Sequence, residues 1–71
     1  MTIKREEVFN AIKDYIEENG YSPSVRDICK VTGRNSTATI TYFLKILKSE
    51  GYIDYNPKLR RTIKIVKEIE E

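Results

Sequence analysis

The side chains at positions 36–42 are those whose types and spacing point most directly to chemistry. Read as a helix, residues 36–50 place their apolar side chains in one stripe, at i, i+3, i+4 and i+7. Although 34% of the chain is charged, residues 36–44 carry no charge. Short hydroxyl and methyl groups can approach another surface closely, such as base edges in a DNA major groove. The alternative is an ordinary amphipathic helix with a neutral first half. The apolar stripe comprises Ile40, Phe43, Leu44 and Leu47, and the opposite side comprises Ala38, Tyr42, Lys45 and Ser49, flanked by Thr39 and Thr41.

The remaining composition gives no sign of catalysis or metal binding. The 71-residue chain has one Cys and no His, so it can form neither an internal disulfide nor a Cys/His zinc site. Cys29 is read as a small core residue. No Gly-rich phosphate loop or carboxylate pair stands out. We therefore predict no enzyme activity, no catalytic residue, no metal, no cofactor and no small-molecule ligand. No apolar run is long enough to span a membrane.

Basic charge is concentrated in one part of the chain. Residues 26–64 contain nine basic and three acidic side chains, a net charge of +6, and the remaining residues carry −4. Such a concentration of positive charge is typical of a segment that binds a polyanion. The alternative is chance segregation of charge in a chain whose overall net charge is only +2.

Residues 3–19 are predicted to form an amphipathic helix, which Thr2 caps and Gly20 ends. Its polar side is mostly acidic, so we expect it to face away from nucleic acid and to be structural. The predicted buried stripe comprises Val8, Phe9, Ile12, Tyr15 and Ile16.

Residues 25–32 and 37–50 predict a helix-turn-helix. Ser24 and Asp27 have the spacing of a capping box at the start of the first of these helices. Gly33 ends that helix, and a small residue four positions earlier suits a steep crossing of two helices through a short turn. The turn is about one residue longer than in the simplest version of this motif.

After Gly51 the hydrophobic period changes from 3.6 to 2. Residues 52–55 and 62–65 alternate and are rich in β-branched and aromatic side chains, which predicts two strands. The loop between them carries turn residues and three cations. The predicted fold class is therefore mainly α with small β: a three-helix winged helix-turn-helix with a two-stranded C-terminal wing at about 52–66. We expect one domain over residues 1–71, with 67–71 as a polar tail that is frayed or leads elsewhere.

Several short segments, in order, resemble the DNA-binding domain of the LexA repressor family. They cover nearly the whole chain and are Gly20-Tyr21-Ser22-Pro23-Ser24-Val25-Arg26-Asp27-Ile28, Gly33…Ser36, Leu44-Lys45-x-Leu47, Gly51-Tyr52-Ile53 and the loop Pro57…Arg61. The resemblance implies a winged domain that binds operator DNA as a cytoplasmic, nucleoid-associated repressor of DNA-damage (SOS) genes. LexA proteins continue into a second domain with a Ser/Lys dyad and a self-cleavage site. That domain is missing here, so we expect a fragment or a stand-alone relative, for example from a mobile element.

The resemblance also implies that the third helix enters the major groove. Carried over by position, the base-reading residues are Ser36, Ala38, Thr39, Thr41 and Tyr42. Some members carry acidic residues near positions 41 and 42, and this chain does not. Tyr42 is also large for a residue close to the groove, so the operator sequence cannot be transferred.

Basic residues around this helix are the predicted phosphate contacts, which position a protein on DNA without reading its sequence. The expected partner is a double-stranded DNA operator, with a homodimer on DNA left open. One alternative is a winged-helix protein-interaction module whose third helix docks a partner protein and whose basic wing serves solubility. Another is a mobile-element regulator without LexA-like operator specificity. The predicted phosphate contacts are Arg26, Arg34, Lys45, Lys58, Arg60 and Arg61.

Overall fold

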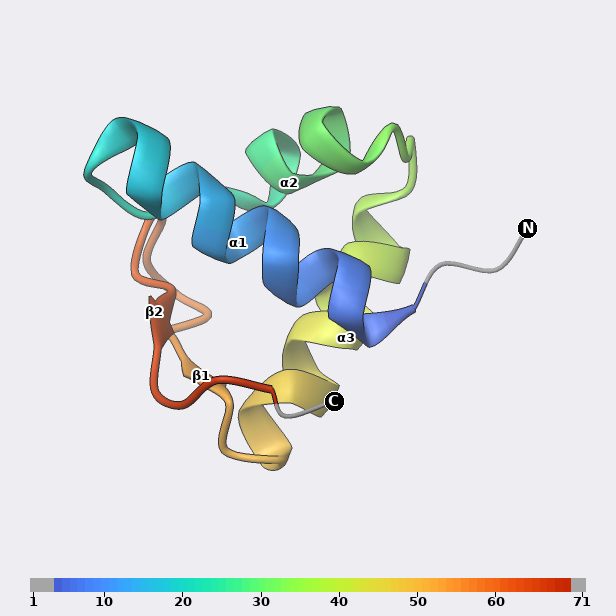
Figure 1. The fold of residues 1–71 in the computed structure, drawn as a ribbon. Coiled ribbons are helices and arrows are strands. Elements are labelled where there is room, and N and C mark those ends of the chain that lie inside the picture. The colour runs from blue at the N-terminus through green and yellow to red at the C-terminus, as the bar shows by residue number, and fades with distance from the viewer. Residues whose placement is uncertain (1–3, 70–71) are drawn as a thin grey trace.

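The computed structural model describes residues 4–69, which form three helices followed by a two-stranded antiparallel hairpin (Figure 1). Each helix contacts the other two, and the hairpin packs on the third helix through its first strand. The arrangement confirms the predicted fold class, a winged helix-turn-helix. None of the helices within residues 4–69 is both long and apolar enough to cross a bilayer. The elements are α1 (Arg5–Asn19), α2 (Val25–Thr32), α3 (Thr37–Ser49), β1 (Ile53–Asp54) and β2 (Lys64–Ile65).

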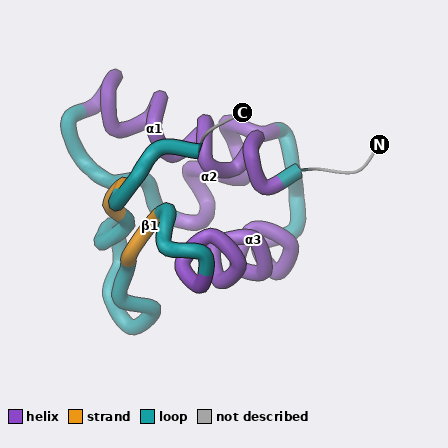
Figure 2. Tube along the Cα trace, turned by 60° about the horizontal axis from the view of Figure 1, so that its bottom comes forward, coloured by secondary structure: helices purple, strands orange, loops and turns teal. Residues whose placement is uncertain are grey.

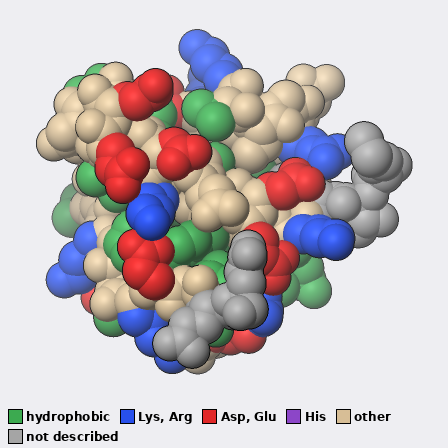
Figure 3. Space-filling model, in the orientation of Figure 1, with side chains coloured by type: hydrophobic (Ala, Val, Ile, Leu, Met, Phe, Trp, Pro, Cys, Tyr) green, Lys and Arg blue, Asp and Glu red, His purple; other side chains and the backbone are tan. Residues whose placement is uncertain are grey.

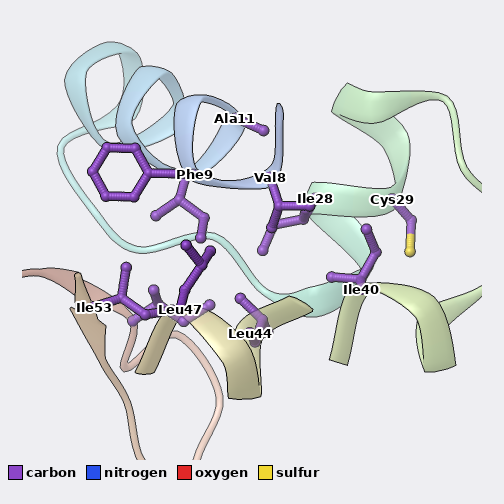
Figure 4. Packing of buried hydrophobic residues seen from close by; sticks show 11 residues of the cluster. Val8, Phe9, Ala11, Ile28, Cys29, Ile40, Leu44, Leu47 and Ile53 are labelled. Atoms are coloured by element: carbon purple, nitrogen blue, oxygen red, sulfur yellow. The ribbon is translucent and has the colours of Figure 1, made fainter. Parts of the chain in front are cut away.

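All three helices and the hairpin contribute side chains to one apolar core (Figure 4). Ile53 lies beside Leu47 in this view, so the hairpin is attached to α3 by apolar contact. Burying an aliphatic side chain of this size stabilises the fold by about 1.5–3 kcal/mol. Tyr15 and Ile16, predicted for the α1 stripe, are only half-buried. The core residues are Val8, Phe9, Ala11, Ile12, Ile28, Cys29, Ile40, Leu44, Leu47, Ile53 and Ile63.

The start of α1 differs from the sequence expectation. The helix begins at Arg5, and Lys4 is its N-cap without a side-chain hydrogen bond to the helix. Thr2, the predicted cap, lies outside the described residues. Gly20 ends the helix with a left-handed backbone, as expected for a residue without a Cβ.

Both helices of the helix-turn-helix begin with side-chain caps. The hydroxyl of Ser24 accepts from the backbone N–H of Asp27 at 3.2 Å, and the Asp27 carboxylate accepts from the Ser24 N–H at 3.0 Å. This is the predicted capping box. Ser36 caps α3 by accepting from the Thr39 N–H at 3.2 Å. Between them, Gly33 adopts φ 72°, which lets the chain leave α2 and enter α3 within a few residues.

The strands of the hairpin are shorter than the predicted segments. Ile53 pairs with Ile65 and Asp54 with Lys64, and the ladder ends there. Beyond it, a side chain replaces the ladder: the Thr62 hydroxyl accepts from the Asn56 N–H at 2.9 Å and donates to the Asn56 carbonyl at 3.2 Å. These two hydrogen bonds close the base of the loop that carries Lys58, Arg60 and Arg61.

Residues 67–69, part of the segment 67–71 that we expected to be a polar tail, frayed or leading elsewhere, contact the body of the domain. The Lys67 ammonium lies 4.9 Å from the centre of the Tyr52 ring. Glu68 forms an ion pair with Lys13 of α1 at 3.1 Å, and Ile69 packs against the core. These contacts could not be predicted from the sequence, because the segment is mostly charged and the partners Tyr52 and Lys13 are far away along the chain. Residues 70 and 71 lie outside the described residues.

Candidate nucleic-acid interface

The side of α3 that faces away from the core carries the predicted base-reading residues. Ser36, Ala38 and Tyr42 are exposed, and Thr39 and Thr41 are half-buried. Tyr42 is a large hydrophobic side chain on this helix with 61% of its surface exposed. The structure therefore brings all five predicted residues to one outward surface near the start of α3. We call it the α3 face.

The hydroxyls of the α3 face are not equivalent. The Thr41 hydroxyl donates its proton to the Thr37 carbonyl at 2.8 Å, so only its oxygen lone pairs are left to accept a hydrogen bond. The Ser36 oxygen already accepts from the backbone as the helix cap. The Thr39 hydroxyl has no hydrogen-bond partner within residues 4–69 and can donate or accept. The face thus offers acceptors for base amino groups and methyl groups for thymine.

A groove of about 540 Å³ separates this helix-turn-helix from the hairpin, and we call it the wing groove. Its walls come from the start of α2, the middle of α3 and the loop between the strands. Figure 2 shows α3 and this loop on the same side of the molecule, opposite α1. The basic residues lining it are Arg26, Lys45, Lys58, Arg60 and Arg61, and Thr41 of the α3 face also lines it.

A second hollow lies at the turn between α2 and α3. Arg34, the remaining predicted phosphate contact, lines this hollow, and Arg26 lines both hollows. Lys30 and Thr37 also line it and were missed by the sequence prediction. Lys30 follows Arg26 by four residues on α2, so helical spacing alone was a signal for it. None of the described residues lining either hollow is acidic.

Acidic side chains gather elsewhere, around α1. Figure 3 shows several Asp and Glu side chains over the face on which α1 lies in front. The first turn of this helix carries Glu6 and Glu7. The separation of the acidic α1 side from the two basic hollows gives the molecule an uneven charge distribution despite a net charge of only +2. A polyanion is attracted to the basic side.

Two of the predicted phosphate contacts are already paired with carboxylates. Arg61 makes an ion pair with Asp27 at 2.9 Å and donates to the Ser22 carbonyl at 3.1 Å. Arg34 lies 3.7 Å from the Glu7 carboxylate of α1. The sequence predicts the same role, phosphate contact, for Arg60 and Arg61, because they are adjacent in one basic loop. In the structure Arg60 has no ion-pair partner within residues 4–69, and Arg61 is bonded to the body of the domain.

The contacts of Asp27, above all its capping bond with Ser24, hold its carboxylate in the charged form. Its pKa lies below the ordinary value of 3.8, mainly because the Ser24 backbone N–H donates to the carboxylate. The Ser24 hydroxyl, the Tyr15 hydroxyl and, least of the three, the positive charge of Arg61 lower this pKa further. Asp27 is therefore a stably charged group, and Arg61, which lines the wing groove, neutralises it.

A basic hairpin placed beside the exposed second helix of a helix-turn-helix defines the class of this protein as a winged-helix DNA-binding domain. Residues 1–62 match the LexA DNA binding domain family, and the chain belongs to that family. The match contains the α3 face and the loop of the wing groove as far as Thr62.

Similar proteins carry the name LexA repressor. The chain is 48% identical over 63 residues to one from Clostridium botulinum, 46% over 66 residues to one from Caldicellulosiruptor saccharolyticus and 38% over 65 residues to one from Carboxydothermus hydrogenoformans. These alignments cover 89%, 93% and 92% of this chain, but 31%, 33% and 32% of the relatives. The chain therefore spans about a third of the length of the relatives it matches.

Proposed function

We propose that this chain binds double-stranded operator DNA with sequence specificity and represses transcription, as a LexA-type repressor of DNA-damage genes. The observation that carries the proposal is the continuity of two surfaces. The uncharged, hydroxyl-rich α3 face adjoins the cationic wing groove, and Thr41 belongs to both. One surface suits base edges and the other suits the phosphates that flank them. The repressor role rests on the name of the relatives.

In this proposal α3 lies in the major groove and reads bases. Thr39 and Thr41 contribute hydroxyl and methyl groups, and Ala38 contributes a methyl group that fits against a thymine methyl. Because Thr41 can only accept, it favours the amino groups of adenine or cytosine. Ser36 and Tyr42 complete the base-reading set at the edges of the helix. None of these groups makes the bidentate contact to guanine that Arg provides, so DNA shape carries part of the specificity.

Basic residues from both hollows meet phosphates. Arg26 and Lys45 flank the α3 face, and Lys58 and Arg60 extend from the wing. Arg34 and Arg61 add positive charge to the same surface, although their guanidinium groups already contact carboxylates. Each phosphate neutralised contributes about 0.9 to the slope of log affinity against log salt.

One such domain covers a half-site. Two copies bound to half-sites about one helical turn apart, or a multiple of it, are expected for useful affinity, which corresponds to a homodimer on DNA. Operators with two half-sites should therefore bind two chains. Sedimentation of the complex at matched concentrations measures this ratio.

A binding-site selection from random duplexes, followed by fluorescence anisotropy on the selected DNA, tests the proposal. The wing variant Lys58→Ala/Arg60→Ala should weaken all sequences alike and reduce the salt slope by about 2. Thr39→Ala or Tyr42→Ala should instead change which sequence is preferred. Lys13→Ala on α1 is the matched control, because Lys13 lines neither hollow, and it should leave affinity within about twofold.

Two results would contradict the proposal. If the protein is not retained on DNA even at low salt, the α3 face serves another purpose, and the protein-interaction module becomes the better reading. If α3 variants lower affinity uniformly while wing variants alter base preference, the two surfaces have the opposite roles.

A further inference from the structure

Arg61 connects the wing to the segment between α1 and α2. Its guanidinium forms the ion pair with Asp27 at 2.9 Å and donates to the Ser22 carbonyl at 3.1 Å and to the Tyr15 hydroxyl at 3.4 Å. The guanidinium carbon also lies 5.1 Å from the centre of the Tyr21 ring, within cation–π range. One side chain from the hairpin thus contacts four residues that belong to the helical part of the domain.

The backbone next to Arg61 supports the same attachment. Arg61 adopts φ 56°, a left-handed conformation that is uncommon for a residue with a Cβ. Such a conformation persists where the surroundings determine it strongly. Two residues later, the Ile63 N–H donates to the Ser22 hydroxyl at 3.0 Å, and the Ile63 side chain is in the core. Residues 61–63 are therefore fixed against the α1–α2 connection.

The other arm of the hairpin has its own attachment. Lys48 of α3 donates to the Tyr55 carbonyl at 2.9 Å, and its ammonium lies 4.9 Å from the centre of the Tyr55 ring. The loop that carries Lys58 and Arg60 lies between the two attachments, and both of these cations are exposed. The direction of the loop relative to α3 is thus set from both ends.

We propose that Arg61 is a positioning residue for DNA binding rather than a phosphate contact. Its pair with Asp27 fixes the wing relative to α2 and α3, so that Lys58 and Arg60 meet phosphates while the α3 face occupies the major groove. The pair also neutralises the Asp27 carboxylate, which contacts Arg61 of the wing groove. This inference rests on the proposed DNA binding.

The two roles of Arg61 give opposite expectations for Asp27→Asn. If Arg61 binds a phosphate directly, removing the nearby negative charge should leave DNA affinity unchanged or strengthen it, because Asp27 competes with the phosphate and repels it. If Arg61 positions the wing through Asp27, the same variant should weaken binding, although it makes the protein more positive. The sign of this one effect separates the two roles.

The experiment measures affinity for the selected duplex at several salt concentrations for Asp27→Asn, Arg61→Gln, their double variant and Arg60→Gln. Asp27→Asn and Arg61→Gln should each weaken binding about twofold to fivefold, the range that partly exposed pairs sustain. The double variant should be no weaker than either single variant, since both break the same contact. The salt slope should stay at the wild-type value in the single variants Asp27→Asn and Arg61→Gln. Arg60→Gln should instead lower the salt slope by about 0.9.

Two further measurements separate positioning from a general loss of structure. Amide hydrogen exchange at Ile63 should speed up in Asp27→Asn and Arg61→Gln and remain unchanged in Arg60→Gln. Ser24→Ala removes the other half of the capping box without touching Arg61, so it controls for weakening of α2. Arg61→Lys keeps the charge but loses the planar guanidinium that lies over the Tyr21 ring, and it should restore little of the affinity.

Unchanged or tighter binding by Asp27→Asn, or a salt slope lowered by about 0.9 in Arg61→Gln, would overturn the positioning role and make Arg61 a phosphate contact. Unchanged Ile63 exchange in both variants would show that the pair does not hold the wing. Equal weakening by Ser24→Ala and Asp27→Asn would assign the effect to the cap of α2. If the wild-type chain binds no DNA at low salt, the proposed function fails, and the exchange measurement still reports whether the pair anchors the hairpin.

Discussion

At the scale of single residues, Asp27 has two structural roles, of which only one can be predicted from the sequence. Its carboxylate closes the capping box of α2 with Ser24 and also binds Arg61 from a hairpin 34 positions further along the chain. The first role is visible in the spacing of Ser24 and Asp27, because a capping box is local. The second role is visible only when the hairpin is in place.

This double role predicts a pH-dependent stability. Folding lowers the pKa of Asp27 below its ordinary value of 3.8, first through the Ser24 N–H, so the charged carboxylate favours the folded state. The stabilisation is complete above the ordinary pKa and is lost as pH falls through the lower pKa of the folded state. Asp27→Asn lacks it. The difference in free energy of unfolding between wild type and Asp27→Asn should therefore shrink between about pH 5 and pH 2.

Urea denaturation of both proteins at several pH values measures this difference. Glu7→Gln, which alters a carboxylate on α1, is a suitable comparison because no Ser cap binds its side chain within the described residues. A difference for Asp27→Asn that stays constant from pH 5 to pH 2 would contradict the prediction.

At the scale of elements, the helix-turn-helix depends on the short turn between α2 and α3. The Gly33 N–H approaches the Lys30 carbonyl at 3.4 Å, and the Arg34 N–H donates to the Cys29 carbonyl at 2.9 Å. These bonds satisfy carbonyls that the end of α2 leaves free. The turn then directs α3 outward with its apolar stripe on the core and the α3 face in solvent.

Gly33→Ala tests the importance of this turn. The position has φ 72°, and no atom lies within 4 Å of an added Cβ, so the cost is backbone strain rather than a steric clash. We expect the free energy of unfolding to fall by about 1–2 kcal/mol, as for a left-handed residue with a Cβ. Gly33→Asn should lose less, because Asn tolerates this conformation. Urea denaturation measures both variants, and equal stability of wild type and Gly33→Ala would show that the turn relaxes freely.

At the scale of the whole molecule, a small core holds together three helices and a hairpin that cannot persist alone. A domain of this length has a net stability of about 4–10 kcal/mol. The two-residue strands form too short a ladder to be independently stable, so the wing depends on Ile53 and Ile63 in the core. A DNA-binding surface built from α3 and the wing therefore exists only while the core is intact.

Leu44→Ala should show this dependence. Leu44 is 2% exposed in the core, and its truncation should cost about 2–5 kcal/mol, a large part of the total stability. Loss of DNA binding should follow unfolding and recover at lower temperature. The neighbouring exposed Lys45→Ala should change stability by less than about 0.5 kcal/mol while weakening DNA binding. Thermal denaturation followed by circular dichroism, with anisotropy at each temperature, measures both effects, and full stability of Leu44→Ala would contradict this view of the core.

The sequence by itself determined the elements and the character of the α3 face. Hydrophobic periodicity, Ser and Gly caps and the change of period after Gly51 are local signals, since each reflects contacts within a few residues of the chain. They were sufficient for three helices, a hairpin and the winged-helix class. They also placed Thr39, Thr41 and Tyr42 on one side of a helix, because helical geometry alone fixes which residues share a face.

Only the tertiary structure decided how the cations differ from one another. Arg60 and Arg61 are exposed neighbours with the same chemistry, yet Arg61 is bonded to Asp27 and Ser22, whereas Arg60 has no ion-pair partner within the described residues. Lys67 and Glu68 likewise contact Tyr52 and Lys13, and Ile69 packs against the core. The physical reason is that an ion pair between residues far apart in sequence depends on how the helices and the hairpin pack together, and no local pattern of residues encodes that arrangement.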